Sequence, residues 1–276
     1  MTHTLSPDEL RRLQLVLLEM LAELDRVCKK RGIRYCVIAG TLLGAVRHGG
    51  FIPWDDDLDV AMTRGEYLRF RAACETELDG ARFFFQDNTT DPRYPWGWGR
   101  LRRLGSEFVR AGQEHLKMRT GVFLDVFPVD AVPDFPPLRG LFAARCFLLR
   151  KTLYAETGAV SAKSAAARAV YRALRKIPAA WAFRRLESLQ DRGLNRGTKY
   201  VRILTFPTPR GRPYGYLREW YEDLADVEFE GRLFPAARGR DAYLTYKYGD
   251  YMTLPPPAER HWHPAAKFRL PEEFQL

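Results

Sequence analysis

The sequence predicts an α+β fold, in which a mixed β-sheet is flanked by helices and interrupted by a basic helical insert. Apolar residues recur at helical spacing from Leu10 to Cys28. Short apolar and aromatic runs then alternate with helical segments up to about residue 130. A long Ala- and Arg-rich stretch follows before short strands return. The 276 residues, 46% of them hydrophobic, suffice for one large domain with an insertion.

The first elements have clear boundary signals. Ser6, Pro7 and Glu9 form a capping-box helix start, and Gly32 is suited to end that helix. The elements expected next are a strand at 33–39, a short helix at 42–46 opened by Gly40 and Thr41, a strand at 57–62, a helix at 65–78 and a strand at 82–86.

Further along, residues 91–98 read as a loop, and 99–104 and 107–110 as a hairpin around Gly105 and Ser106. An apolar strand at 121–127 contains one acid, Asp125, before four prolines break the pattern. Residues 138–194 are mostly helical, and short strands and turns follow from 199. We therefore expect a catalytic core at 1–135, a basic helical insert at 136–198 and a C-terminal element at 199–276 that completes the same domain.

Composition excludes several classes of protein. No run of about 18 uncharged apolar residues is present, so we expect no membrane-spanning helix. The N-terminus lacks the pattern of a signal peptide. Four scattered cysteines form no Cys-x-x-Cys pair and predict reduced thiols in a cytoplasmic protein.

The positive charge is concentrated in the insert. Residues 136–199 contain 14 lysines and arginines against three acids, a net charge of +11, whereas the whole chain carries +10. Basic amphipathic helices with aromatic anchors favour an anionic membrane surface. The alternative is a helical pair packed on the core with a solvated basic face. Nucleic acid is the least favoured partner, because no sequence-reading motif occurs.

An acidic run is the most informative feature. Asp55, Asp56 and Asp57 are consecutive, and Asp59 follows. Strand alternation would point Asp55, Asp57 and Asp59 to one face and leave Asp56 to pair with a basic group. Carboxylates so close repel one another unless a cation lies among them, and oxygen ligands suit Mg²⁺ or Mn²⁺. The simpler alternative is a solvated acidic turn.

Two further features join the acidic run. Gly40 and Thr41 open a helix, and a helix N-terminus offers amide groups to phosphate. Asp125 lies in an apolar strand, where an unpaired carboxylate is costly. These three features follow one another along the chain: a helix start made of small residues, an Asp-x-Asp pattern, and a lone acid on a later strand. This is the organisation of the nucleotidyltransferase fold typified by DNA polymerase β.

The run GTLLGAVRHGGFIPWDDDLDVAM (40–62) resembles the signature of the LicD family of phosphocholine and fukutin-type transferases. Similar segments are QDNTTDPRYP (86–95), GVFLDVFPVD (121–130) and YLTYKYGDYMTLPPP (243–257). One departure is Ala39, where the family frequently has a second glycine. The resemblance implies that Asp57 and Asp59 bind the metal, with Asp125 as a third ligand or as the base.

The same resemblance implies transfer of a phosphorylated alcohol, such as phosphocholine or ribitol phosphate, from a CDP-alcohol donor to a hydroxyl of a glycan or related acceptor. Candidate substrate-binding residues are Gly40, Thr41, Arg47, His48, Gln86, Arg100, Arg102 and Lys247. Arg47 and His48 are alternatively basic residues at a helix end, and Arg100 and Arg102 a solvated strand face. The aromatic residues Trp54, Tyr94, Trp96 and Trp98 could stack on a base, surround a quaternary ammonium group or simply pack.

Two other functions remain open from the sequence. The first is a nucleotidyltransferase that uses an NTP and releases pyrophosphate, which the fold alone does not separate from the leading function. The second is a non-catalytic membrane-docking or scaffold protein with an inherited fold. The pair His261 and His263 lacks a nearby cysteine and does not match a standard zinc spacing.

Overall fold

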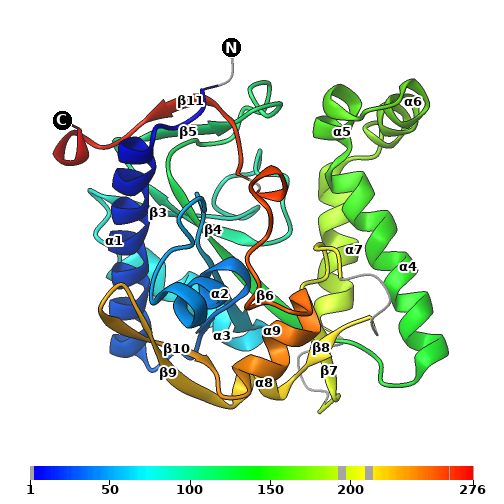
Figure 1. The fold of residues 1–276 in the computed structure, drawn as a ribbon. Helices are drawn as coiled ribbons and strands as arrows, with labels where there is room; N and C mark the ends of the chain where they lie inside the picture. Colours follow the sequence, from blue (N-terminus) through cyan, green and yellow to red (C-terminus); the bar gives the residue numbers. More distant parts are fainter. Residues whose placement is uncertain (1–2, 192–196, 209–213, 261, 276) are drawn as a thin grey trace.

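A mixed β-sheet lies at the centre of the computed structural model, which describes residues 3–191, 197–208, 214–260 and 262–275. Its strands run in the order β1-β2-β6-β4-β3, and β7 and β8 extend it from β6. Figure 1 shows α1 along one side of the molecule and α4 to α7 grouped on the other. The predicted mixed sheet flanked by helices is thus confirmed.

The elements before the insert are α1 (Pro7–Arg31), β1 (Cys36–Val37), α2 (Ala39–His48), β2 (Asp59–Thr63), α3 (Arg64–Glu77), β3 (Phe83–Gln86), β4 (Gly99–Arg103), β5 (Glu107–Arg110) and β6 (Phe123–Ala131). The insert consists of α4 (Pro136–Leu153), α5 (Ala155–Ser161), α6 (Ala165–Leu174) and α7 (Ala179–Asp191). Its expected helical character is confirmed over these ranges. The predicted helical end at 192–194 lies outside the described residues.

After the insert come β7 (Tyr200–Arg202), β8 (Tyr216–Leu217), α8 (Glu219–Glu222), β9 (Leu224–Phe229), β10 (Arg232–Ala237), α9 (Arg240–Tyr248), η1 (Pro257–Glu259), β11 (Ala265–Arg269) and η2 (Glu272–Phe274). β9 and β10 form a separate hairpin, and β11 pairs with β5.

The predicted start of α1 is confirmed in detail. Ser6 Oγ accepts the amide of Glu9, and the Glu9 carboxylate accepts the amide of Ser6. Gly32 ends the helix with φ 59°, a left-handed conformation that glycine adopts at little cost. The buried face of α1 then packs against β4, β6 and α3.

The predicted hairpin of 99–104 with 107–110 is wrong. β4 pairs with β3 on one edge and β6 on the other, so no edge remains for β5. The turn at Gly105, φ 75°, instead carries β5 out of the sheet to meet β11. The turn signal was local, whereas the pairing depends on a strand about 160 residues downstream.

Several strand limits also differ from the prediction, and β1 covers only Cys36–Val37 of the expected 33–39. β2 begins at Asp59 rather than at residue 57, and β6 continues through Pro128 to Ala131. The amide of Asp125 donates to Leu58 O on the β2 side, so position 128 faces the β4 side. Pairing with β4 ends at Val126. A proline at 128 therefore removes no hydrogen bond from the ladder.

The core has two principal apolar clusters. The larger joins α1 to the sheet and includes Leu17, Leu21, Val60 and Val126. The smaller lies between α4 and α7, where Phe142, Cys146, Leu149 and Leu153 meet Ala182, Phe183, Leu186 and Leu189. All four cysteines are free and buried. Across the described residues, no helix combines the length and apolarity needed to cross a bilayer.

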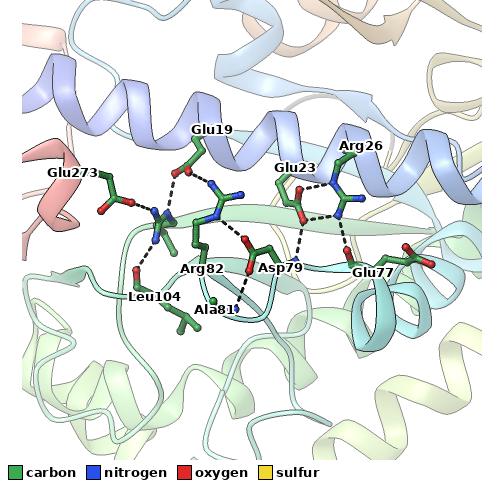
Figure 2. A network of polar contacts seen from close by, with 10 residues as sticks. Glu19, Glu23, Arg26, Glu77, Asp79, Ala81, Arg82, Leu104 and Glu273 are labelled. Atoms are coloured by element: carbon green, nitrogen blue, oxygen red, sulfur yellow. Dashed lines mark hydrogen bonds and ion pairs between the residues drawn. The ribbon is translucent and has the colours of Figure 1, made fainter.

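Ion pairs attach α1 to the edge of the sheet, as Figure 2 shows. Arg82 pairs with Glu19 of α1 at 2.8 Å and with Asp79 at 2.7 Å. Glu23 accepts from Arg26 at 2.7 Å and from the amide of Asp79 at 3.2 Å. Because Arg82 and Arg26 are largely exposed, we attribute to this network mainly the orientation of the helix.

A buried pair connects α3 to β6. Arg64 Nε and Nη2 donate to the two carboxylate oxygens of Asp130 at 2.8 and 2.6 Å. Both side chains are almost completely enclosed. A bidentate ion pair of this kind, with two parallel hydrogen bonds, compensates the free-energy cost of removing both charges from water.

We expect Asp130→Asn to lower the free energy of unfolding by about 3 kcal/mol, because it leaves the Arg64 guanidinium buried without a counter-charge. Urea unfolding measures the change. The matched control is Asp223→Asn, which breaks the exposed pair with Arg238 and should change stability little. Equal stability of the two variants would contradict the role given to the buried pair.

Candidate active site

Two carboxylates and an arginine lie side by side on three adjacent strands. Asp59 on β2 is the register partner of Asp125 on β6, and Asp125 is the partner of Arg100 on β4. Arg100 Nε donates to Asp125 Oδ1 at 2.7 Å, and Trp98 Nε1 donates to the same oxygen at 2.8 Å. The sheet register therefore places the charges, because register partners project from the same face.

Asp57 reaches this site from the loop before β2. Its Oδ2 accepts from Arg110 Nη2 at 2.8 Å and lies 3.6 Å from His263 Nδ1. Strand alternation does not apply to Asp57, since β2 begins two residues later. It nevertheless borders the same cleft as Asp59 and Asp125.

Asp56 contacts a basic partner, as expected, but strand alternation is not the cause, because Asp56 precedes β2 and approaches the same histidine as Asp57. Asp56 Oδ1 is 2.9 Å from His263 Nδ1, and its Oδ2 accepts the amide of His263 at 3.0 Å. This pair attaches the segment before β11 to the acidic run, although 207 residues separate the two in sequence. His261, two residues before His263, lies outside the described residues.

The acids face a cleft of about 440 Å³ between the sheet and the insert. Asp57, Asp59 and Asp125 form one part of its wall. Arg150, Lys151 and Tyr154 of the α4 end, together with Tyr171 of α6, form another. The insert thus contributes directly to the cleft, with cationic and aromatic side chains.

Burial and repulsion make the cleft electrostatically unfavourable for carboxylates alone. Burial, followed by the charges of Asp57 and Asp125, raises the pKa of Asp59 well above its ordinary value. Burial and the neighbouring acids likewise raise the pKa of Asp55. Burial lowers the pKa of Lys247, and the attraction of Asp59 opposes that shift. A cation among these carboxylates would relieve the repulsion.

Gly40 and Thr41 support the acidic run from the start of α2. A Cβ at position 40 would lie 2.7 Å from Asp55 Oδ2, so glycine permits this close approach. Thr41 Oγ1 accepts the amide of Asp59 at 2.8 Å and fixes the start of β2. Ala39 has φ 51°, a left-handed conformation that glycine adopts at less cost than alanine.

Lys247 belongs to a smaller neighbouring cavity of about 30 Å³, which Asp59, Ile38 and Ala39 also line. The structure therefore brings Lys247, from α9, next to the start of α2 and the acid on β2.

Four other predicted residues lie away from the cleft lining. Arg47 donates to Tyr251 O at 2.8 Å, and His48 is exposed, both at the far end of α2. Gln86 and Arg102 are enclosed on the sheet, with Arg102 Nε donating to Gln86 Oε1 at 2.7 Å. Gln86 is the register partner of Arg100, so it extends the row of Asp59, Asp125 and Arg100 to β3.

Aromatic rings form much of the remaining cleft. Trp98 stacks on Trp96 with ring centroids 5.7 Å apart, and Trp96 lies 6.0 Å from Tyr154. Phe127 and Phe206 pack against Trp98 from the other side. Tyr94 is fully buried, and Trp54 meets Arg260 and His48 rather than the cleft.

Several site residues had no individual sequence signal. Arg110, Arg150, Lys151 and Tyr171 were not singled out, and His263 was considered only with His261 as a zinc pair, because the fold brings each of them to the cleft from a part of the chain distant from the acidic run. The positive charge of the insert was the only general signal for Arg150 and Lys151. Their position in the cleft could not be derived from it.

A compact group of possible metal ligands also appears within the described residues. Single ligand atoms of Asp56, Asp57 and His263 all lie within 4.8 Å of one another. Oxygen and imidazole ligands of this kind suit a divalent ion. Asp57 belongs both to this group and to the carboxylates of the cleft, so the acidic wall offers ligand atoms on two sides of Asp57.

The chain is similar in sequence to known proteins. The family description "LicD/FKTN/FKRP, nucleotidyltransferase domain" matches residues 32–134. The chain is 30% identical over 259 residues to the lipopolysaccharide cholinephosphotransferase LicD of Haemophilus influenzae, covering 92% of this chain and 95% of that protein. It is 47% identical over 55 residues to the human ribitol 5-phosphate transferase FKRP, which is 20% of this chain and 10% of that protein.

We expect Asp59→Asn to stabilise the protein at neutral pH in EDTA. A carboxyl whose pKa is raised on folding stabilises the fold when protonated and loses that contribution as pH rises through the raised pKa. Removing the charge should therefore raise the thermal midpoint by about 2–4 °C, or about 1 kcal/mol. The gain should shrink as pH is lowered.

The matched control is Asp226→Asn on β9, an exposed carboxylate whose loss should leave the midpoint unchanged. A midpoint for Asp59→Asn below that of the native chain at every pH would contradict the account of the buried charge.

Proposed function

The chain belongs to the LicD family and is a phosphotransferase, and from this premise we propose that it moves a phospho-alcohol group, phosphocholine-like in kind, from a CDP-activated donor to a hydroxyl of a glycan or related acceptor. The observation that carries the proposal is the pair of register partners Asp59 and Asp125, with Asp57 beside them, in a cleft of substrate size. We also propose that the sheet is a nucleotidyltransferase core of the polymerase-β type.

The acidic wall offers carboxylate oxygens to a divalent ion, and the ligand atoms there that lie within 4.8 Å of one another are those of Asp56, Asp57 and His263. Asp59 carries a raised pKa among like charges, and no hydrogen bond or ion pair joins its carboxylate to another described residue. Asp57, Asp59 and Asp125 would hold Mg²⁺ or Mn²⁺, which when bound neutralises charge on the donor phosphates.

The chain's own groups then position and deprotonate the acceptor. Both donors to Asp125, Trp98 and Arg100, reach Oδ1, so among the described residues nothing occupies Oδ2. That oxygen serves as a ligand or takes the proton of the acceptor hydroxyl. The acceptor oxygen forms the new bond to phosphorus, and the bond from phosphorus to the CMP oxygen breaks, so that CMP leaves.

The remaining predicted residues are proposed to act around this centre. Gly40, Thr41 and Lys247 border the donor phosphates at the start of α2. Arg100 orients Asp125. Gln86 and Arg102 support Arg100 from within the sheet, while Arg47 secures the far end of α2 against the C-terminal segment and His48 packs edge-on against Trp54.

We propose that the chain consists of a core at 1–135, an insert at 136–198 and a C-terminal element at 199–276. Residues from all three parts line the cleft. Asp57 comes from the first, Lys151 from the second and His263 from the third. The third part completes the site rather than forming a separate unit.

We expect the purified chain to release CMP and modify an acceptor when given CDP-choline or a related CDP-alcohol with Mg²⁺. Asp57→Asn and Asp59→Asn should each lower kcat by at least about a thousandfold, because each removes a charge that neutralises the transition state. Asp226→Asn should retain full activity. Chromatography of CMP and labelled acceptor measures both products.

Activity that survives both substitutions would refute the proposal. Release of pyrophosphate from an NTP, without turnover of any CDP-alcohol, would instead identify a nucleotidyltransferase. Failure of Mg²⁺ and Mn²⁺ to alter thermal stability, with and without nucleotide, would support the non-catalytic alternative.

We further propose that the enzyme works in the cytoplasm, peripherally on the inner face of the membrane. The support is an exposed flank of α4 on which Leu138, Leu141 and Leu148 are 55%, 53% and 62% exposed. Arg145 is exposed on the same flank. Apolar side chains beside cations suit the interface of an anionic bilayer.

We expect the chain to bind vesicles that contain phosphatidylglycerol, and the double variant Leu141→Glu/Leu148→Glu to bind at least about tenfold more weakly. Sedimentation with vesicles measures this. Leu233→Glu on β10, a leucine that is 60% exposed, is the matched control. Equal binding of the double variant and the control would exclude this flank as the contact.

A further inference from the structure

Two cations of the insert that line the cleft, and a third beside it on β7, have no carboxylate partner among the described residues. Lys151 Nζ donates only to Tyr171 Oη, at 2.8 Å, and otherwise faces aromatic rings. Arg150 lies over the ring of Phe147 at 5.4 Å. Arg202, on β7, donates to the carbonyls of Ile203 and Phe206. This contrasts with Arg64, Arg100 and Arg110, which each pair with an aspartate.

The isolation of Arg202 is unusual because the residue is only 3% exposed. Its register partner on β6 is Asp130, but both oxygens of Asp130 are taken by Arg64. Its Nη1 has no hydrogen-bond partner, and its guanidinium lies 3.4 Å from the centre of the Tyr214 ring. A buried guanidinium with a free donor and no counter-charge is costly unless an anion binds nearby.

A cavity of about 180 Å³ lies between Arg150 and Arg202, and Lys151 lies beside it in the main cleft. Arg150 and Arg202 line the cavity together with Thr208 and Tyr214, and no carboxylate of the described residues does. Arg150 and Pro207 also line the main cleft, so the cavity adjoins the acidic site. Arg102 is a useful contrast: it also has a free donor atom, but it bonds to the side chain of Gln86 and lines no such cavity.

From these observations we infer that the insert side of the cleft contains a binding subsite for a phosphate-class anion, contacted by Arg150 and Lys151 and held in the field of Arg202. Arg150 and Lys151 are partly exposed and can donate directly. Arg202 is enclosed, so it contributes charge rather than a hydrogen bond to the ligand. Burial lowers the pKa of Arg202, and a bound anion would offset that effect.

The subsite rests on the proposed function for its place in the reaction. Asp57, Asp59 and Asp125 repel anions unless a metal is bound, whereas the opposite wall attracts them without one. Two sources have the required chemistry: the diphosphate of the donor, or a phosphate carried by the acceptor. Either would bring its reacting group between the two walls.

The first test measures binding without turnover. Inorganic pyrophosphate is titrated into the full chain in EDTA by calorimetry, so that the acidic wall cannot contribute through a metal. Arg150→Gln and Lys151→Gln should each raise the Kd at least about tenfold, as expected for the loss of one charge-assisted hydrogen bond. Arg184→Gln, an exposed arginine on α7, should change it less than about twofold.

The Arg150 side chain makes no hydrogen bond to another described residue, so the variant should fold normally, as circular dichroism would check. A folded Arg150→Gln/Lys151→Gln double variant that binds pyrophosphate as tightly as the native chain would overturn the inference. Loss of binding in a chain that transfers no CDP-alcohol would retain the subsite and refute only the proposed function.

The second test separates the two sources through steady-state kinetics of the same variants. A raised KM for the CDP-alcohol with an unchanged KM for the acceptor identifies the donor diphosphate. A raised KM for the acceptor alone identifies a phosphate on the acceptor. Unchanged values of kcat and of both KM would show that neither substrate uses these residues, and would overturn the inference.

Discussion

The structure depends on the alignment of β2 with β6, which places the Asp59 and Asp125 carboxylates side by side in a partly buried sheet. Two negative charges so placed destabilise the fold unless opposite charge is supplied. The protein supplies part of it: Arg100 and Trp98 donate to Asp125, and Arg110 donates to Asp57. Asp59 receives no such partner among the described residues. The uncompensated charge therefore lies at the carboxylates that we propose as metal ligands.

Other features hold this alignment in place. Thr41 accepts the amide of Asp59, so the start of α2 fixes where β2 begins. Gly40 allows Asp55 to approach that helix closely. Asp56 binds His263, which attaches the C-terminal segment to the acidic run. Each contact joins a different part of the chain to one short sequence, so changes in this sequence would disturb both the fold and the site.

Local signals were sufficient for part of this arrangement. The capping box of α1, the Asp-x-Asp pattern and the lone acid Asp125 could be recognised from a few neighbouring residues. The pairing of β5 with β11 could not, and the predicted hairpin was wrong, because the free edge that β5 uses is created by the C-terminal strand. Arg110 was missed, and His263 was considered only as a zinc ligand with His261, for the same reason: the proximity of both to Asp57 depends on that distant pairing.

The charge of the insert can be explained by the geometry of α4. Successive residues of a helix are rotated by about 100° around its axis. Arg150 follows Leu141 by nine residues, so the two side chains point to opposite sides of α4. One flank therefore exposes Leu138, Leu141 and Leu148 with Arg145, while the other directs Arg150 toward the cleft. The buried stripe of Phe142, Cys146 and Leu149 between these flanks packs on α7. Because one rigid helix has both surfaces, a membrane contact on the first flank would fix the orientation of the second, and with it the side from which an anionic substrate enters.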